Sequence, residues 1–217
     1  MIDLHTHSLL SDGSLIPAEL VRRAVMHNYS AIAITDHVDF TNIEFVLDSI
    51  RKTSFLEDEW EIQVLTGVEI THVPPGKIAV LADKARSLGA DIIVVHGETV
   101  VEPVAPGTND AALRADIDIL AHPGIITPDE AELARKNSIA LEITARAGHN
   151  RTNGHVARIA SEIGCALVVD TDTHAPEDLI TDEMAFKIAV GAGLDDRSAL
   201  AATRTNPMRL VESRSRE

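Results

Sequence analysis

Short runs of hydrophobic, mostly β-branched residues recur along the chain between longer segments in which hydrophobic residues return every three to four positions. We count seven such runs, at residues 2–5, 31–35, 62–70, 91–96, 117–122, 139–143 and 165–170. These runs lack the alternation of hydrophobic and polar residues that is typical of a strand with one solvent-exposed face. They therefore predict parallel strands buried on both faces. The segments between them, such as 17–28 and 76–89, have the period of amphipathic helices. The pattern therefore predicts a strand–helix unit repeated seven times.

This pattern is compatible with a closed β/α barrel and with an open doubly wound sheet, and it does not choose between them. Helix starts are indicated at Pro17, Pro75 and Pro128, because proline is favoured in the first turn of a helix. A chain of 217 residues is long enough for one sizeable core, so we expect a single domain over residues 1–217. The polar segment after about residue 209 is expected to fray.

The charge balance and the scarcity of aromatic residues argue against a stable nucleic-acid partner. The chain has 19 Lys and Arg against 34 Asp and Glu, a formal net charge of −15, and 3% aromatic residues. Nucleic-acid binding depends on cationic contacts to phosphates and, for single strands, on aromatic stacking. Polyanions are therefore poor candidate partners, although bound metal cations would still allow a local anion site.

The sequence also bears on the cellular compartment. Cys165 is the single cysteine and lies in an apolar run, which predicts a core residue and excludes both a disulfide framework and a thiolate metal site. The first residues lack the basic and apolar blocks of a signal peptide, and no apolar stretch approaches the roughly 20 residues that span a bilayer. We expect a cytoplasmic protein without membrane contacts.

Residues that commonly bind metals fall at the ends of the predicted strands. They are His5, His7, His37, Glu69, His96, His122, Glu142, Asp172 and His174. In a parallel barrel the carboxyl ends of all strands meet at one rim, which is where active sites of this architecture lie. The pattern thus predicts one cluster of imidazoles and carboxylates.

The composition of this cluster indicates the kind of metal. His5 and His7 are two positions apart on an extended segment, so both imidazoles can reach one ion. An HxH pair alone is weak support, but six of the ten histidines lie at predicted strand ends beside carboxylates. Imidazole and carboxylate ligands without thiolate suit zinc, manganese or iron.

Taken together, these segments resemble the motifs of the PHP family, named for polymerase and histidinol phosphatase. The motifs are HTH at residues 5–7, Asp12, TDH ending at His37, GVE ending at Glu69, His96, AHP at residues 121–123 and DTH ending at His174. They follow the family's order from Ile2 to about Asn206. The resemblance implies a distorted (β/α)7 barrel of the TIM type with a metal site at the carboxyl ends of the strands, and so favours the barrel over the open sheet.

The resemblance further implies two to three divalent metal ions (Zn, Mn or Fe). The implied ligands of the first ion are His5, His7, Glu69 and Asp172. Those of the second are Glu69, His96 and His122, and those of the third are Asp12, His37 and His174. No ligand position is lost, which favours catalysis over a purely structural role.

Two ions that share Glu69 would hold a bridging hydroxide, which we expect to be the nucleophile, with Glu69 and Asp172 as the catalytic carboxylates. His149 could protonate the leaving group, although a histidine in a loop is more often a surface residue.

The candidates for phosphate binding are Arg146 or Arg151 in one loop and, as a second option, Arg204 together with Asn206 near the end of the chain. An exposed arginine is more often a solvated charge, so these assignments stay open.

Several further polar residues lie next to the predicted ligands. Asp3, Asp36 and Asp170 could accept hydrogen bonds that fix histidine tautomers, or could be solvated or capping carboxylates. Glu142 and Glu98 are candidate supporting residues. His72 could face the mouth or cap a helix, whereas His27 and His155 fall in helical segments and are interpreted as surface or packing residues.

The longest loose stretch, Thr99 to Asn109, predicts either a mobile flap beside the site or a passive surface loop.

The leading functional hypothesis is a phosphomonoesterase for a small phosphorylated metabolite, for which histidinol phosphate is a plausible substrate. A phosphodiesterase or nucleotide-releasing hydrolase is the enzymatic alternative, and a non-catalytic metal-binding scaffold is the alternative from another class.

Overall fold

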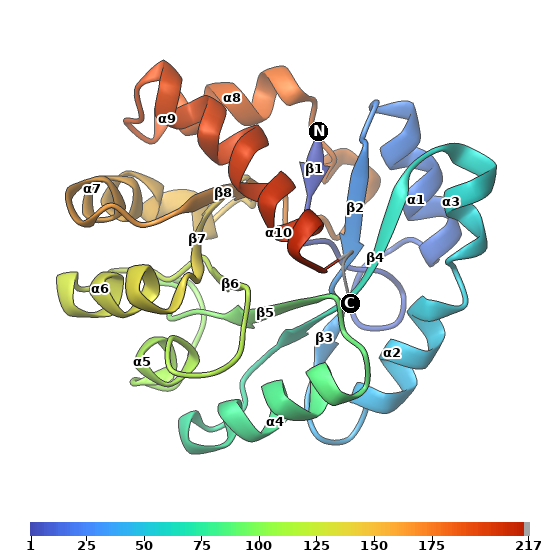
Figure 1. Ribbon diagram of the computed structural model, residues 1–217, viewed down its shortest axis with the longest axis horizontal. Coiled ribbons are helices and arrows are strands. Elements are labelled where there is room, and N and C mark those ends of the chain that lie inside the picture. Colours follow the sequence, from blue (N-terminus) through green and yellow to red (C-terminus); the bar gives the residue numbers. More distant parts are fainter. Residues whose placement is uncertain (215–217) are drawn as a thin grey trace.

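The strands lie side by side in parallel and form a ring, with helices on its outside (Figure 1). This computed structural model describes residues 1–214 of the chain. The strands are β1 (Ile2–Asp3), β2 (Ala31–Ile34), β3 (His37–Val38), β4 (Gln63–Ile70), β5 (Ile92–His96), β6 (Ile119–Ala121), β7 (Ala140–Thr144) and β8 (Leu167–Asp170). Each of the seven predicted hydrophobic runs overlaps one of these strands. The second run, residues 31–35, corresponds to β2, and β3 follows it after Thr35 and Asp36; both strands pair with β4.

The sheet is a nearly closed barrel of seven parallel strands, in the order β1-β2-β4-β5-β6-β7-β8. Its last gap is closed beyond the regular strands, where Thr6 and Thr173 form a parallel bridge. Beside this bridge, the backbone N–H of Asp172 donates to the carbonyl of His5 at 2.9 Å. The predicted distorted (β/α)7 barrel is therefore confirmed, and the open doubly wound sheet is excluded.

Ten α-helices and three short 3-10 or π-helical segments lie between the strands or follow the last one in the described part of the chain. Their bounds are α1 (Pro17–Met26), α2 (Ile43–Arg51), α3 (Phe55–Trp60), α4 (Pro75–Ser87), α5 (Thr108–Ala112), α6 (Pro128–Asn137), η1 (His149–Thr152), α7 (Asn153–Ile163), η2 (Pro176–Asp178), α8 (Asp182–Gly191), α9 (Asp196–Leu200), η3 (Ala201–Thr205) and α10 (Asn206–Arg214). The three predicted helix starts are correct, since Pro17, Pro75 and Pro128 are each the first residue of a helix. Thr127 adds a capping box with Glu130 at the start of α6.

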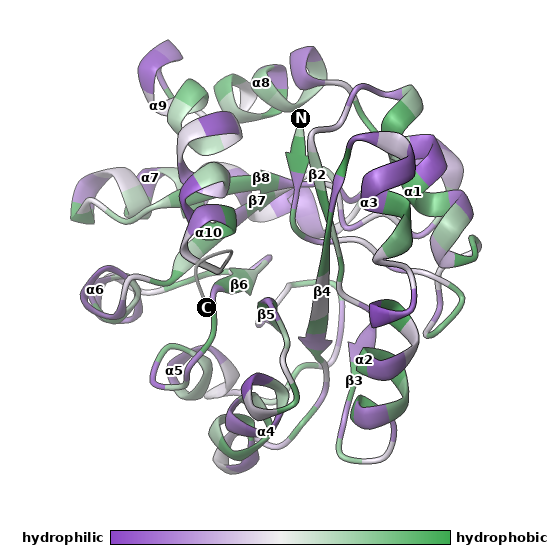
Figure 2. Ribbon diagram, turned by 45° about the vertical axis from the view of Figure 1, so that its right-hand side comes forward, coloured by the Kyte–Doolittle hydropathy of each residue, from purple (hydrophilic) through white to green (hydrophobic). Residues whose placement is uncertain are grey.

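The core has two layers, and the strands between them are mainly hydrophobic (Figure 2). The outer and larger layer lies between the strands and the helices. The inner layer fills the barrel with side chains such as Leu4, Ala33, Leu65, Val94 and Val168. At about 25 cal/mol per Å² of buried apolar surface, these layers are the main source of stability. They hold the strand ends, and the polar side chains on them, at fixed positions.

The segment after residue 209 was predicted to fray, but residues 210–214 are helical. It continues α10, which lies near the centre of the ring in Figure 1. Val211 is buried and packs with the inner layer of the core, together with the partly buried Leu210. The sequence did not predict this packing, because the two hydrophobic residues of this segment are surrounded by polar ones. Residues 215–217, also predicted to fray, lie outside the described residues.

Within the described residues, no helix is long and apolar enough to cross a membrane.

Candidate metal centre

All nine predicted metal ligands lie at the carboxyl ends of the strands or in the loops that follow them. The alternation of the strands explains part of this arrangement. On β5, the side chains of Ile92 and Val94 fill the barrel, and His96, two residues further along, lies on the same face at the strand end. His5, His7, Glu69, His96, His122 and Asp172 are all at least 97% buried. The predicted convergence is present in the tertiary structure.

His5, His7 and Asp172 form one compact group of donor atoms. The Nε2 atoms of His5 and His7 are 3.1 Å apart. Asp172 Oδ1 lies 3.3 Å from His7 Nε2, and Glu69 Oε1 lies 3.3 Å from His5 Nε2. The first predicted ligand set is thus brought together.

Asp12, His37 and His174 form a second group with His7, closer to the solvent. Asp12 Oδ1 lies 3.2 Å from His174 Nε2 and 3.5 Å from His37 Nε2. These three residues are the third predicted set.

The remaining predicted set, Glu69 with His96 and His122, is only partly assembled. His122 Nε2 lies 3.6 Å from Glu69 Oε1, and His5 completes this group of donors. His96 Nε2 instead lies 3.1 Å from Glu102 Oε2 and is grouped with His72 and Glu102. The carboxylate of Glu102 therefore has the place beside His96 that we had assigned to Glu69.

Two of the candidate ligands have a left-handed backbone. The φ angles are 27° at His122 and 52° at Asp172. Non-glycine residues adopt this region at a cost of about 1–3 kcal/mol, and such residues cluster at functional sites. Buried hydrogen bonds hold both positions, from the N–H of His122 to Glu142 Oε2 and from the N–H of Asp172 to the carbonyl of His5.

Burial opposes charge throughout the cluster, but the carboxylates and imidazoles shift one another's pKa in opposite directions. At His5 burial is outweighed by the surrounding carboxylates, Glu142 first, and the pKa is raised well above its ordinary value. At His37 carboxylates again outweigh burial, Glu69 first, and raise the pKa to about 10. The same imidazoles overcome burial at Glu69 and hold its pKa well below its usual range. At His7 burial dominates and lowers the pKa to about 4.

The donor set fits divalent metal ions. Ligands about 2.0–2.1 Å from a tetrahedral zinc ion are about 3.3–3.4 Å from one another, and the contacts among His5, His7, Glu69 and Asp172 are close to that separation. Glu69 Oε1 is buried without a hydrogen-bond partner among the described residues. A buried carboxylate oxygen rarely stays unsatisfied, and a cation between it and the facing imidazoles would satisfy it.

Two roles were left open for Asp3, Asp36 and Asp170, and among the described residues none of the three accepts a hydrogen bond from a histidine ring. Their carboxylates accept hydrogen bonds from backbone N–H groups and hydroxyls of neighbouring strands and loops. The donors include the N–H of Leu4 to Asp170 and the hydroxyl of Thr171 to Asp3, at 2.7 Å each. These carboxylates join the loops at the mouth rather than orienting imidazoles.

Other groups orient the histidines. Glu142, a candidate supporting residue, accepts from Nδ1 of His5 at 2.7 Å. Thr71, which the sequence analysis did not single out, has its hydroxyl oxygen 2.6 Å from Nδ1 of His37. Thr71 lies two residues beyond Glu69, so its proximity to a predicted ligand was a usable signal.

Of the three candidate phosphate-binding arginines, only Arg146 lines the pocket among the donors at the mouth. Its Nη1 lies 3.2 Å from Asp178 Oδ2, and this carboxylate also accepts from the N–H of His174. Arg151 is exposed. The assignment of Arg204 is wrong, because this residue lies beside Met1 and Ile2, at the amino-terminal end of the strands, opposite the metal centre.

Asn206 lies at the same end as Arg204 and donates to the carbonyl of Leu167. Its assignment to phosphate binding is therefore wrong too, because order along the chain did not reveal which end of the barrel the segment covers.

His149 is buried at the mouth, with its ring 4.3 Å from that of His122. It is therefore not the surface-loop histidine of the alternative interpretation. Burial and the neighbouring His122 lower its pKa to about 4. Nε2 of His155 donates to the carbonyl of Ile126, in keeping with a packing role. His27 is half-buried near Tyr29.

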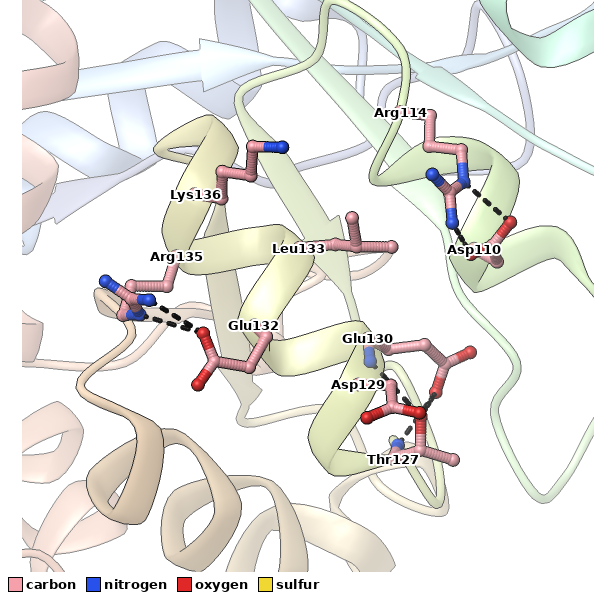
Figure 3. Close-up of a pocket in the computed structure, with 9 residues that line it drawn as sticks. All are labelled: Asp110, Arg114, Thr127, Asp129, Glu130, Glu132, Leu133, Arg135 and Lys136. Carbon is pink, nitrogen blue, oxygen red and sulfur yellow. Dashed lines mark hydrogen bonds and ion pairs between the residues drawn. The ribbon is translucent and has the colours of Figure 1, made fainter.

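A surface groove of about 620 Å³ lies elsewhere, between α5 and α6 (Figure 3). Its arginines are already paired with carboxylates three or four residues earlier in the chain, Arg114 with Asp110 and Arg135 with Glu132. The charged side chains therefore do not converge on one point. The chemistry lies in the smaller pocket at the barrel mouth.

The barrel carries at its mouth several groups of imidazoles and carboxylates that could hold metal ions. Comparison with known proteins gives the family, because residues 3–160 match the PHP domain. The chain belongs to the PHP family and is a phosphoesterase.

Two relatives illustrate the range of similarity. The chain is 55% identical over 201 residues to uncharacterized protein MJ1295 of Methanocaldococcus jannaschii, covering 90% of this chain and 91% of that protein. It is 37% identical over 168 residues to the 5'-3' exoribonuclease Rnm of Escherichia coli, covering 76% of this chain but 49% of that protein.

Solved structures share the fold at low sequence identity. A chain in the cryo-EM structure of archaeal ribonuclease P with mature tRNA has a TM-score of 0.73 at 15% identity, covering 98% of this chain and 91% of that chain. Histidinol phosphate phosphatase from Lactococcus lactis, in complex with zinc, L-histidinol and phosphate, has a TM-score of 0.59 at 16% identity, covering 98% and 92%.

Proposed function

We propose that this chain is a metal-dependent phosphomonoesterase that acts on a small phosphorylated metabolite with the help of two to three divalent ions. The observation that carries the proposal is the position of Glu69. Its carboxylate lies 3.3–3.6 Å from Nε2 of His5, His7 and His122, and 2.6 Å from Nδ1 of His37, so one buried anion touches a residue of each of the three predicted ligand sets.

The residues at the mouth would have two different roles, to hold the metal ions and to orient the histidines that bind them. Zinc, manganese or iron held by them would supply a nucleophilic water at neutral pH and would offset charge on the phosphoryl oxygens. Glu142 keeps Nε2 of His5 directed at the mouth by binding Nδ1. Thr71 and Glu69 both contact Nδ1 of His37 at 2.6 Å, which leaves its Nε2 directed at Asp12. Because these side chains are oriented before substrate binds, the site needs little reorganisation during the reaction.

Arg146 and His149 would act on the substrate itself. Arg146 lines the mouth and its Asp178 partner holds it there, so its guanidinium would bind phosphoryl oxygens. His149 lies where it could protonate the leaving group. Its lowered pKa leaves the ring neutral at pH 7, so we propose that it takes up its proton only when an anionic phosphate lies beside it.

A phosphodiesterase or nucleotide-releasing hydrolase is the second candidate. The similarity to the exoribonuclease Rnm of Escherichia coli supports it, since a nuclease cleaves phosphodiesters. The strongly negative net charge of −15 argues against tight binding to a long polyanion. We therefore rank a small monoester first.

The test is hydrolysis of p-nitrophenyl phosphate, bis-p-nitrophenyl phosphate and histidinol phosphate by protein loaded with zinc, manganese or iron. A His5→Ala, His7→Ala double variant is the negative control, and His27→Ala, outside the mouth, is the matched positive control. Monoester turnover that is lost only in the double variant would support the proposal. Preference for the diester would favour the second candidate. If metal-loaded protein hydrolyses neither, the scaffold hypothesis takes its place.

A further inference from the structure

A loop that none of the PHP motifs includes places a carboxylate against the metal centre. Glu102 lies in the segment between β5 and α5, and its Oε2 is 3.1 Å from Nε2 of His96. Nδ1 of His96 faces the carbonyl of Gly97 at 3.2 Å, so Nε2 is the nitrogen with which this buried ring can bind an ion. The carboxylate of Glu102 is therefore next to the atom of His96 that would bind the metal.

His122 lies on the same side of the mouth. Its ring centroid is 4.5 Å from that of His96, and Glu102 lines the mouth pocket together with these two histidines. The 3.1 Å between Glu102 Oε2 and His96 Nε2 is close to the separation of about 3.3–3.4 Å between two ligands of one tetrahedral zinc ion. Glu102 thus lies where a further ligand of the ion at His96 and His122 would be.

Two more histidines, neither of them in the ligand sets that the PHP motifs imply, surround the carboxylate. Nε2 of His72 is 3.5 Å from Glu102 Oε2, and Nε2 of His149 is 3.4 Å from the other oxygen, Oε1. His72 therefore faces the mouth, and its left-handed φ of 52° resembles that of the candidate ligands His122 and Asp172. A carboxylate that binds a metal is usually held in turn by donors around it, as Glu102 is here.

Hydrogen bonds at the base of the loop fix where Glu102 lies. Oε1 of Glu98 accepts from the N–H groups of Gly107 and Asn109 at 2.9 and 3.0 Å. The side chain of Asn109 binds back to the N–H of Glu98 and to the carbonyl of Pro123. The supporting role predicted for Glu98 is therefore to close this loop, and the loop is not a passive surface segment.

The residue before Glu102 is held as well. The two methyl carbons of Val101 lie 3.8 Å from the position that a Cβ would have at Gly148, in the loop that carries His149. The chain is thus fixed at the base of the loop and directly beside Glu102, so this carboxylate is directed at the mouth.

We propose that Glu102 is a ligand of the ion that His96 and His122 help to hold, in addition to the ligands that the PHP motifs imply. The proposal adds no ion, because His96 still binds one metal and the loop supplies a further carboxylate to that same metal. Imidazoles with a carboxylate are a ligand set that zinc commonly takes. The inference rests on the part of the proposed function that places divalent ions at the mouth, and not on the identity of the substrate.

A ligand on a loop would make the order of that loop depend on metal. The side chain of Glu102 is 38% exposed, whereas that of His96 is 3% exposed at the end of β5. An ion bound by both would connect the exposed loop to the rigid barrel. We therefore expect metal binding to order residues 99–106.

The first experiment is zinc titration of the apoprotein against a chromophoric chelator, with elemental analysis for the number of equivalents. The variant is Glu102→Gln. One control is Asp39→Asn, which removes a charge from the groove that Glu102 and Asp39 both line but keeps the oxygen that accepts from Thr41. The other control is Glu183→Gln on the exposed surface of α8.

Glu102→Gln should bind the same number of zinc equivalents as the wild type, with the affinity of one of them lowered on the order of tenfold or more. Both controls should titrate like the wild type. An unchanged titration in Glu102→Gln would overturn the proposal. A loss of the same size in Asp39→Asn would also overturn it, because charge near the mouth would then explain the effect without ligation. A wild type that binds no metal would overturn this inference and the proposed metal-dependent function together.

A double-mutant cycle tests which ion Glu102 binds. His96→Ala should weaken or remove one zinc equivalent, and adding Glu102→Gln to it should not lower the affinity of the remaining equivalents. Two residues that bind one ion have non-additive effects on it. Losses that add up on different equivalents would overturn the assignment of Glu102 to the ion at His96.

Hydrogen exchange of the loop gives a readout that needs no enzymatic turnover. Saturating zinc should slow amide exchange in residues 99–106 of the wild type and of Asp39→Asn, and should have little effect on them in Glu102→Gln. Slowing of equal size in Glu102→Gln would contradict ligation by the loop. Because all of these readouts measure metal binding, failure of the proposed phosphomonoester substrate would leave them unaffected.

Discussion

Nδ1 of His5 lies 2.7 Å from Oε1 of Glu142, and both side chains are completely buried beneath the barrel mouth. The second oxygen of Glu142 accepts from the backbone N–H of His122, a residue with a left-handed φ of 27°. A single carboxylate therefore fixes the ring of one candidate ligand and the backbone of another.

Glu142→Gln should weaken metal binding by about 10–100-fold, the usual effect of removing an acceptor behind a ligating histidine. The glutamine has one oxygen, so its amide nitrogen must face either His5 or the N–H of His122, and one of the two loses its acceptor. Metal affinity can be measured by chelator competition. Glu132→Gln, on the exposed surface of α6, is the control, and equal affinities in the two variants would contradict this role for Glu142.

Arg146→Ala should lower kcat/KM for a phosphomonoester by about 10–100-fold, or about 1.4–2.7 kcal/mol. Its guanidinium is the cationic side chain that lines the mouth pocket. Arg204→Ala is the control, since Arg204 lies at the other end of the barrel, and should leave kcat/KM unchanged. Steady-state kinetics of both variants is the measurement. A larger effect at Arg204 would mean that the substrate does not bind at this mouth.

His149→Asn tests the leaving-group donor. A proton donor matters most when the leaving group is basic, so the variant should lose activity on an alkyl phosphate by about 100-fold or more and much less on p-nitrophenyl phosphate. The comparison of kcat for the two esters in each protein cancels general damage to the site. A uniform loss on both substrates would indicate a structural role for His149 instead.

Metal affinity should increase as the pH is raised from about 6 to 8. The pKa is raised at four of the candidate ligands, His5, His37, His96 and His174, and reaches about 10 at His37. In the metal-free protein these histidines therefore hold protons that a metal must displace. His7, with a pKa of about 4, is already neutral and contributes no such proton. Calorimetric zinc titrations in buffers of different ionisation enthalpy would count the protons released. Affinity that is independent of pH, with no proton release, would contradict these assignments.

Val211→Ser should lower the free energy of unfolding by about 2 kcal/mol, because it removes an apolar side chain from the inner core and leaves a hydroxyl there. For a chain of this size that corresponds to a fall in Tm of roughly 4–8 °C. Val190→Ser, at an exposed position of α8, is the control and should change Tm little. The Tm of both variants and of the wild type can be measured by monitoring thermal unfolding with circular dichroism. An unchanged Tm in Val211→Ser would mean that α10 does not contribute to the core.

The sequence by itself determined the strands and the cluster at their ends. Hydrophobic periodicity is local, and a parallel strand buried on both faces is readable from a few consecutive residues such as 91–96. Once strands are parallel, their last residues must meet at one rim, so His5, Glu69 and Asp172 could be brought together without coordinates. The proline at each of three helix starts was readable for the same local reason.

Only the tertiary structure decided which side chains contact one another through space. The pairing of His96 with Glu102 depends on how a loop is closed by Glu98, and no spacing in the sequence encodes that. The exclusion of Arg204 from the mouth depends on α10 and its neighbours covering the amino-terminal end of the barrel. The roles of Asp3 and Asp170 stayed open in the sequence because a carboxylate beside a ligand can turn toward either the imidazole or the next strand. That choice is made by packing and hydrogen-bond geometry, which involve residues far apart in the chain.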